Sequence, residues 1–161
     1  MNRHYKTLEL DKILNMLASQ TSIDDAKEMA LGLEPQFDLE KVNKLLKQTD
    51  DAVVLSGKFG TPSFGGASNC ANALKRAEAG GCLSTTELLK IAETLRIIRS
   101  VKEWHSKFAS TETSLDGYFS GLVSNKFLEE KITSAIISEV EISDNASSML
   151  ADIRRKIRTA T

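Results

Sequence analysis

A cluster of basic residues near the end of the chain is the best candidate for binding chemistry. The cluster consists of Arg154, Arg155, Lys156 and Arg158. Guanidinium and ammonium groups bind phosphate oxygens, so the cluster predicts contact with nucleic acid. The same residue types also cover the solvated face of ordinary helices, and the formal net charge of the chain is only −1. A nucleic-acid interface and a solvated surface therefore both stay open.

The stretch GKFGTPSFGG, residues 57–66, has the glycine content of a phosphate-binding loop. A GxxxxGK[ST] loop requires a glycine five residues before its Gly-Lys pair and a hydroxyl directly after it. Ala52 and Phe59 occupy these two positions, so both requirements fail. We interpret the stretch as a structural turn between two helices, held to the core by Phe59 and Phe64.

No spacing in the chain predicts a catalytic, cofactor-binding or metal-binding residue. The sequence contains no Ser–His–Asp spacing, no Cys-x-x-Cys pair and no paired carboxylates with a local catalytic signature. His4 is isolated, and His105 next to Trp104 is expected to be partly buried rather than catalytic. The pair Glu129-Glu130 is expected on a solvated helix face.

The composition is that of a soluble globular protein. The chain has 161 residues, of which 41% are apolar and 27% charged. Cys70 and Cys82 are expected to be free thiols in a reducing cytoplasm. The N-terminus lacks the apolar segment of a signal peptide, and no run of 18 apolar residues occurs. We therefore expect a cytoplasmic protein without a membrane partner.

Helical periodicity of apolar residues dominates the sequence, and the expected fold is an all-α bundle of seven or eight helices without a significant sheet. Asp38 and Asn125 are predicted N-caps, and Ser84 with Glu87 forms a predicted capping box. Residues 139–145 are expected to form a loop that includes at most two extended residues. The predicted helices cover residues 6–20, 22–31, 38–56, 69–79, 84–108, 115–122, 125–138 and 147–161.

The last predicted helix has no terminating signal. Ile153 and Ile157 form an i,i+4 apolar stripe, and neither glycine nor proline follows them. A helix that exposes such a stripe usually continues or pairs with another element. We therefore expect the natural protein to continue past Thr161.

Four separated motifs resemble the start of the bacterial MutS-II family, the second MutS paralogue. In chain order they are KTLELDKILNML, TPSFGG, ALKRAEAGGCLSTTELLKIAETLR and DNASSMLADIRRKIR. They cover nearly the whole chain in the order typical of the family. Two departures are Ser148, where the family often has proline, and residues 67–69, where isoleucine and aspartate are common.

The resemblance implies a long parent protein with a helical core and lever, a clamp, a dimeric ABC-type ATPase and a small C-terminal nuclease domain. Such proteins are associated with suppressing homologous recombination on branched DNA and with splitting collided ribosomes. Residues 1–146 would be a helical core domain, and residues 147–161 the truncated start of an Arg-rich lever helix. No cofactor is expected in this chain, whereas ATP and magnesium would bind the absent ATPase domain. DNA, the ribosome and a second subunit would be partners of the parent protein.

The Phe127-Leu128-Glu129 triplet matches the spacing of the phenylalanine and glutamate that read mismatches in classical MutS. A wedge residue must be exposed to enter a base step. Because we assign Phe127 to the apolar stripe of its helix, we interpret this match as coincidence.

Three functional hypotheses follow. The first is a non-catalytic scaffold and lever segment of a MutS-II ATPase and endonuclease. The second is a self-contained helical module that binds a partner protein through an apolar face. The third is a small nucleic-acid binder that uses the basic cluster. Hydrolysis of ATP by the chain alone would contradict the first hypothesis, and charge reversal in the cluster tests the third.

Overall fold

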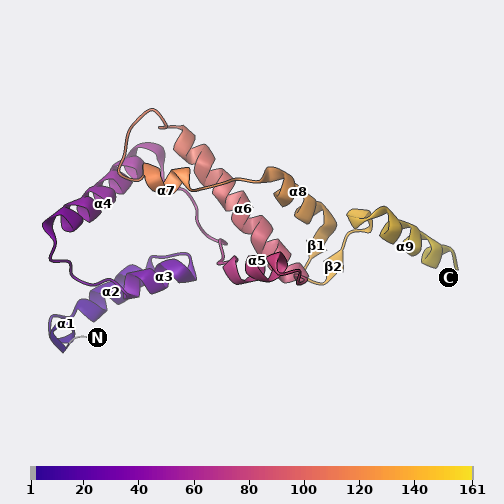
Figure 1. Cartoon of the computed structure of the whole chain (residues 1–161), viewed down its shortest axis with the longest axis horizontal. Helices are drawn as coiled ribbons and strands as arrows, with labels where there is room; N and C mark the ends of the chain where they lie inside the picture. The colour runs from indigo at the N-terminus through magenta and orange to yellow at the C-terminus, as the bar shows by residue number, and fades with distance from the viewer. Residues whose placement is uncertain (1–2, 161) are drawn as a thin grey trace. The chain divides into compact units, whose positions relative to one another are not determined.

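The computed structural model describes residues 3–160, which form nine α-helices, one short β-hairpin and one 3₁₀ turn (Figure 1). The predicted all-α class is confirmed. The chain divides into two compact units. Unit 1 comprises the described residues up to Gly66 together with Ser100–Leu122, and unit 2 comprises Ala67–Arg99 with the described residues from Val123 onward.

The first predicted helix, over residues 6–20, is wrong as a single element. The structure has two helices there, α1 (Arg3–Thr7) and α2 (Leu10–Ser19), because Glu9 adopts a left-handed backbone with φ of 57°. A non-glycine residue with positive φ interrupts the helical hydrogen-bond ladder. The helix α3 (Asp24–Leu31) follows where it was predicted and packs against α2 around buried Leu14, Ala18 and Ala30.

The helix α4 (Leu39–Phe59) begins at its predicted cap. The carboxylate of Asp38 accepts hydrogen bonds from the backbone N–H groups of Glu40 (2.9 Å) and Lys41 (3.1 Å). The helix ends three residues later than predicted, so the first residues of GKFGTPSFGG are helical. Gly60, with φ of 76° and ψ of 167°, ends the helix in a conformation that is open to glycine almost alone.

Aromatic side chains form the core of unit 1 around Phe108, which is 2% exposed. The rings of Phe59, Trp104 and Phe119 lie 5.1, 4.8 and 6.0 Å from it. His105 is partly buried, as predicted, and stacks on Phe119 at 4.4 Å. These contacts join α4 to the short helix α7 (Asp116–Ser120) and the residues before it.

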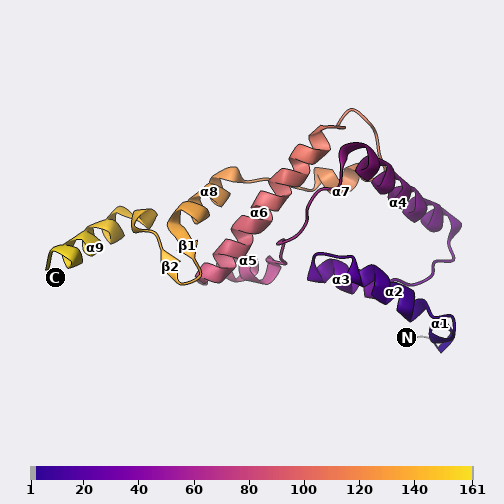
Figure 2. The same ribbon diagram turned by 180° about the vertical axis from the view of Figure 1, so that it is seen from behind.

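The helix α7 lies beside α4 in the ribbon (Figure 2), and hydrogen bonds attach the segment before α7 to α4. Ser114 donates both its backbone N–H (2.8 Å) and its hydroxyl (2.6 Å) to the Asp51 carboxylate. Thr113 donates in the same way to Asp116, at 3.1 and 2.6 Å. These bonds lower the pKa of both carboxyl groups, with the side-chain hydroxyl as the largest cause in each case.

Unit 2 contains the helices α5 (Ala71–Glu78) and α8 (Lys126–Ala135), together with the unit 2 part of α6 (Thr85–Ser106). Its buried cluster consists of Ile91, Ala92, Ile132 and Ile136. The predicted capping box is confirmed, because Ser84 donates its N–H to the Glu87 carboxylate (2.9 Å) and Glu87 donates its N–H to the Ser84 hydroxyl (3.3 Å). Arg76 also pairs with Glu87, and its hydrogen bond, followed by that from the Ser84 N–H, lowers the pKa of the Glu87 carboxyl to about 2.

The predicted helix over residues 125–138 is wrong in its last turn. Asn125 caps α8 as predicted, but the helix ends at Ala135 and residues 136–138 form the strand β1 (Ile136–Ser138). This strand pairs antiparallel with β2 (Glu141–Ile142), opposing Ile136 to Ile142. Consecutive β-branched residues favour an extended backbone, which accounts for the change of structure at Ile136.

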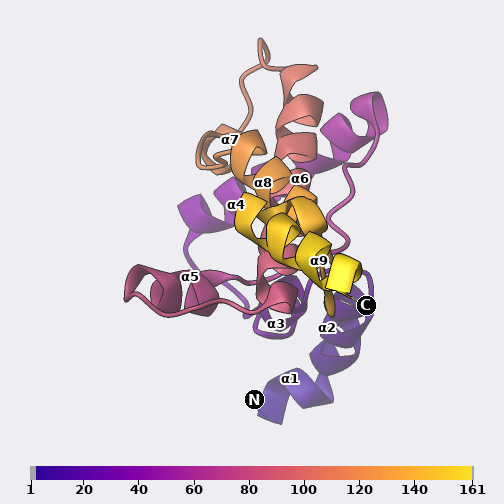
Figure 3. The ribbon, with the colours of Figure 1, turned by 90° about the vertical axis from the view of Figure 1, so that its right-hand side faces the viewer.

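The 3₁₀ turn η1 (Asp144–Ala146) leads from the hairpin into the last helix, α9 (Ser148–Ala160). Ser147 caps this helix as predicted, by accepting a hydrogen bond from the backbone N–H of Leu150 at 3.1 Å. In Figure 3, α9 is the yellow helix nearest the viewer. Within unit 2 it packs against η1, and Arg154 also binds the backbone of β2.

Candidate functional site

The predicted basic cluster divides into two pairs with different surroundings. Arg154 and Arg158, one turn apart on α9, both bind the carboxylate of Asp144 in η1. The Arg158–Asp144 distance is 3.2 Å, and Arg154 also donates to the backbone carbonyl of Ile142 at 2.9 Å. The hydrogen bond from Arg154 is the main reason that the pKa of Asp144 lies below its ordinary value. These two arginines are therefore engaged within unit 2.

Arg155 and Lys156 form the second pair and face solvent. Arg155 binds Asp152 at 2.9 Å on the same helix, with 73% of its side chain exposed. Lys156 makes no ion pair with any residue in the range 3–160. An exposed i,i+3 pair is weak and exchanges readily with solvent or with another anion. The Arg158 side chain is also 68% exposed although it binds Asp144, so three side chains of the predicted cluster are accessible to an anionic group of a partner, and nucleic-acid binding stays a prediction.

A buried ion pair joins α8 to α6. Glu129 is 8% exposed, and Arg99 donates to its two carboxylate oxygens from Nε (3.1 Å) and Nη2 (2.8 Å). The hydrogen bonds from Arg99 lower the pKa of Glu129 more than any other contact. The expectation that Glu129 lies on a solvated face is wrong.

The expectation that Phe127 lies inside is also wrong. Its side chain is 74% exposed, and the amine of Lys131 lies 5.8 Å from the ring centroid. Phe127 and the buried Ile132 are five residues apart, which places them about 140° apart around the helix axis. The inward face of α8 instead carries Glu129, Ile132 and, directly after the helix, Ile136. The reason given for dismissing the Phe127-Leu128-Glu129 spacing therefore fails, although exposure by itself assigns this residue no role.

The glycine-rich stretch is held by a tryptophan rather than by a ligand. The indole N–H of Trp104 donates to the backbone carbonyls of Phe59 (3.2 Å) and Gly60 (2.7 Å), at the C-terminal end of α4. Carbonyl groups at a helix C-terminus need such donors. These contacts agree with a structural turn.

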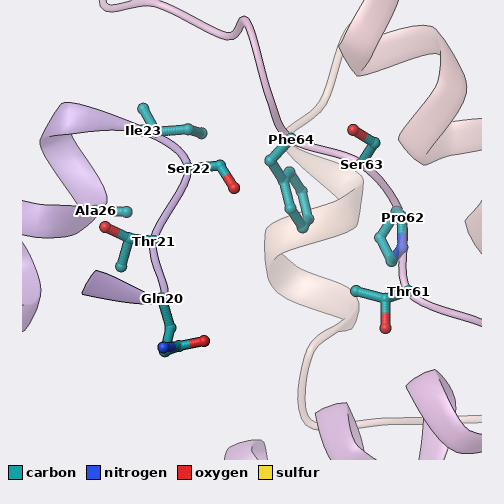
Figure 4. A pocket seen from close by; sticks show the side chains of 9 residues that line it. All are labelled: Gln20, Thr21, Ser22, Ile23, Ala26, Thr61, Pro62, Ser63 and Phe64. Atoms are coloured by element: carbon teal, nitrogen blue, oxygen red, sulfur yellow. The ribbon is translucent and has the colours of Figure 1, made fainter. Parts of the chain in front are cut away.

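A pocket of about 500 Å³ lies between the α2–α3 connection and residues 61–64 (Figure 4). Its lining includes hydroxyl groups from Thr21, Ser22, Thr61 and Ser63, and the ring of Phe64. None of the nine lining residues carries a carboxylate, amine, thiol or imidazole. The pocket therefore has neither an acid–base pair nor an activated nucleophile.

Residues 3–160 contain no group of three or more His, Cys, Asp or Glu side chains able to hold a metal ion. Both cysteines are free, with Cys70 half-buried and Cys82 exposed. Within residues 3–160 no helix has the length and apolar character required to cross a membrane.

Comparison with known proteins supports the family suggested by the motifs. A protein of Acetivibrio thermocellus named Endonuclease MutS2 is 42% identical over 159 residues, covering 96% of this chain and 20% of the relative. Proteins of the same name from Ruminiclostridium cellulolyticum and Clostridium perfringens are 40% and 33% identical, over 96% and 98% of this chain. No protein-family model matches the chain. The chain spans about one fifth of the length of these relatives.

Proposed function

Because this chain is homologous along nearly its whole length to a segment of MutS-II proteins, we propose that it is a non-catalytic helical scaffold of a MutS-II-type endonuclease. In this proposal α9 is the start of a lever, meaning a rigid helix that transmits motion to the rest of the protein. The observation that carries the proposal is the double ion pair of Asp144 with Arg154 and Arg158.

The Asp144 carboxylate binds two guanidinium groups one turn apart, and the less exposed pair with Arg154 favours one position and one rotation of α9 relative to η1. Arg154 also binds the backbone of β2 through the Ile142 carbonyl. An ordinary solvated helix end needs no such attachment. A lever does, because motion of a loosely attached helix would be dissipated before it reached its neighbours.

The attachment continues from α9 into the core of unit 2. The strand β2 pairs with β1, which directly follows α8. The helix α8 is joined to α6 by the buried Arg99–Glu129 pair. Together these contacts give a continuous path of hydrogen bonds and ion pairs from the basic helix to a helix of the core. A chain of packed elements with fixed contacts is the physical requirement for mechanical coupling.

The remaining activities belong to the proposed parent protein. We propose that it binds and cleaves DNA, hydrolyses ATP with magnesium in another domain, and works as a homodimer in the cytoplasm. The name Endonuclease MutS2, carried by the relatives, supports the nuclease activity and DNA as the substrate class. We propose that the parent protein acts in the suppression of recombination and in the splitting of collided ribosomes.

The test uses the parent protein with Asp144→Asn, which removes the charge that binds both arginines. We expect DNA-stimulated ATP turnover to fall severalfold while the basal rate persists, because coupling rather than the ATPase site is changed. Asp152→Asn is the matched control, since Asp152 binds only the exposed Arg155. Equal DNA stimulation in the wild type and the Asp144→Asn variant would contradict the lever role of α9.

A further inference from the structure

The dipeptide Asp116-Gly117 begins the short helix α7. Of the nine glycines in the chain, Gly117 alone follows an aspartate or an asparagine. In such a dipeptide the backbone nitrogen of the glycine can attack the aspartate carboxyl group, because glycine has no side chain to obstruct the approach. Gly117 is exposed, and a methyl group added to it would meet nothing within 4 Å. Its N–H group donates to no backbone acceptor in residues 3–160, so the nitrogen is available for the reaction.

The reaction would change the covalent structure of the backbone at this point. A bond forms between the nitrogen of Gly117 and Cγ of Asp116, while the amide proton and the carboxyl hydroxyl leave together as water. The product is a five-membered succinimide ring. A second water molecule opens the ring at one of its two carbonyl groups. One opening restores aspartate, and the other leaves isoaspartate, whose main chain runs through Cβ and Cγ. The longer main chain of isoaspartate does not fit the regular rise of a helix, so the first turn of α7 would be disrupted.

In the folded chain, Thr113 binds both oxygens of the Asp116 carboxylate. One oxygen accepts the backbone N–H of Thr113 at 3.1 Å, and the other accepts its hydroxyl at 2.6 Å. Thr113 precedes Asp116 by three residues, whereas the attacking nitrogen follows it. Ring closure therefore requires the carboxyl group to leave Thr113 and the backbone of Asp116 to leave its helical conformation. The same bonds lower the pKa of Asp116, with the Thr113 hydroxyl as the largest cause, and an ionised carboxylate has no hydroxyl group to lose.

We propose that Asp116-Gly117 is a site of spontaneous isoaspartate formation, and that Thr113 keeps this site unreactive in the folded chain. Local opening of residues 113–116 is the event that exposes the carboxyl group to attack. The neighbouring Ser114 opposes this opening, because it donates two hydrogen bonds to Asp51 of α4. The modification would in turn detach α7, whose Phe119 contacts the aromatic core of unit 1. Each opening therefore carries a chance of permanent damage to unit 1.

The test is incubation of the 161-residue chain at physiological temperature and neutral pH. Isoaspartate at residues 116–117 is then measured by peptide mass spectrometry after enzymatic methylation of isoaspartyl carboxyl groups. Thr113→Val keeps the shape of the side chain and its backbone N–H bond but removes the hydroxyl. The variant should form isoaspartate at least about tenfold faster than the wild type, because losing a hydrogen bond to a charged group favours release of the carboxylate by such a factor. In urea, where the turn is absent, both chains should react at one common, faster rate.

Thr111→Val is the matched control, since it makes the same substitution at an exposed position two residues earlier and should react like the wild type. Thr113→Ser keeps the hydroxyl and should stay protected. In Thr113→Val/Gly117→Ala the added methyl group obstructs the attack and has space in the fold, so isoaspartate should fall back to the wild-type level or below. Circular dichroism of each variant establishes that its helices are intact. Equal rates in Thr113→Val and the wild type, or a folded wild type that reacts as fast as in urea, would overturn the proposal.

Discussion

At the scale of single residues, the Arg99–Glu129 pair makes a prediction about stability. Arg99→Met removes the partner of a buried carboxylate, and we expect it to lower the free energy of unfolding by about 1.5–3 kcal/mol. Arg96→Met is the control on the same helix, because the Arg96–Glu93 pair is exposed and should contribute less than about 1 kcal/mol. Urea denaturation followed by circular dichroism measures both.

The double variant Arg99→Met/Glu129→Leu distinguishes two contributions to the free energy of unfolding. One is the stabilisation by the ion pair, and the other is the cost of leaving the Glu129 carboxylate buried without a partner. Replacing both partners by apolar residues should recover most of the stability that Arg99→Met loses. If Arg99→Met is as stable as Arg96→Met, then the burial of Glu129 does not require the ion pair with Arg99. The path from α9 to α6 would then lack its last link.

The bonds between Ser114 and Asp51 predict a pH-dependent contribution to stability. Because the pKa of Asp51 is lowered in the folded protein, the contribution is present above the ordinary value of 3.8 and is lost as pH falls through the folded pKa. Ser114→Ala removes the largest cause of the shift. We expect the variant to be less stable than the wild type at pH 7, and the difference to shrink below about pH 4.

Unfolding followed by the fluorescence of Trp104 tests the Ser114→Ala prediction. This tryptophan lies in the aromatic core of unit 1, the unit that also contains the Asp51–Ser114 contact. Ser120→Ala is a suitable control, since the Ser120 hydroxyl donates only to the carbonyl of Gly117 and contacts no carboxylate. A stability difference between Ser114→Ala and the wild type that stays constant from pH 7 to pH 3 would rule out Asp51 as its source.

At the scale of elements, two glycines near the end of α4 should respond in opposite ways to the same change. Gly57 lies inside the helix, and an added methyl group would meet nothing within 4 Å. Gly57→Ala should therefore stabilise the chain by about 0.5–1 kcal/mol. Gly60 has equal space but a backbone that disfavours other residues, so Gly60→Ala should destabilise by about 1–3 kcal/mol. Thermal unfolding of both variants tests the pair, and effects of the same sign would contradict the backbone assignment at Gly60.

Features that depend on neighbouring residues can be predicted from the sequence, whereas features that depend on contacts between distant residues cannot. The caps at Asp38, Ser84 and Asn125 follow from residues at most three positions apart, and each is found in the structure. The burial of Glu129 depends on Arg99, which lies 30 residues earlier, so no local pattern indicates it. The exposure of Phe127 was predictable from helical geometry, because Ile132 and Phe127 lie on nearly opposite sides of α8. The break at Glu9 has no such signal, since glutamate rarely adopts positive φ.

At the scale of the whole molecule, the sequence predicts where the basic cluster lies, but it does not predict which of its side chains form ion pairs within the chain. The sequence places four basic residues on one helix, and it cannot distinguish Arg154 and Arg158 from Arg155 and Lys156. That distinction depends on Asp144, ten residues before Arg154, and on the turn that brings it under α9. Of the hairpin that separates α8 from η1, β1 was expected as the last turn of a helix and β2 as part of a loop. The pairing of β1 with β2 determines where η1 begins, and therefore which arginines lie within reach of the Asp144 carboxylate.

The scaffold proposal makes a final prediction about nucleotide binding by this chain alone. Among residues 3–160 the pocket beside Phe64 has no cationic lining, and the glycine-rich stretch lacks the residues that hold phosphates and magnesium. A ligand present at one hundred times its Kd stabilises a protein by about 2.7 kcal/mol, which raises Tm by several degrees for a chain of this size. Millimolar Mg-ATP should leave the Tm of the 161-residue chain unchanged and should raise that of the parent protein. A comparable rise in the isolated chain would place a nucleotide site within it, and the scaffold role would then have to be abandoned.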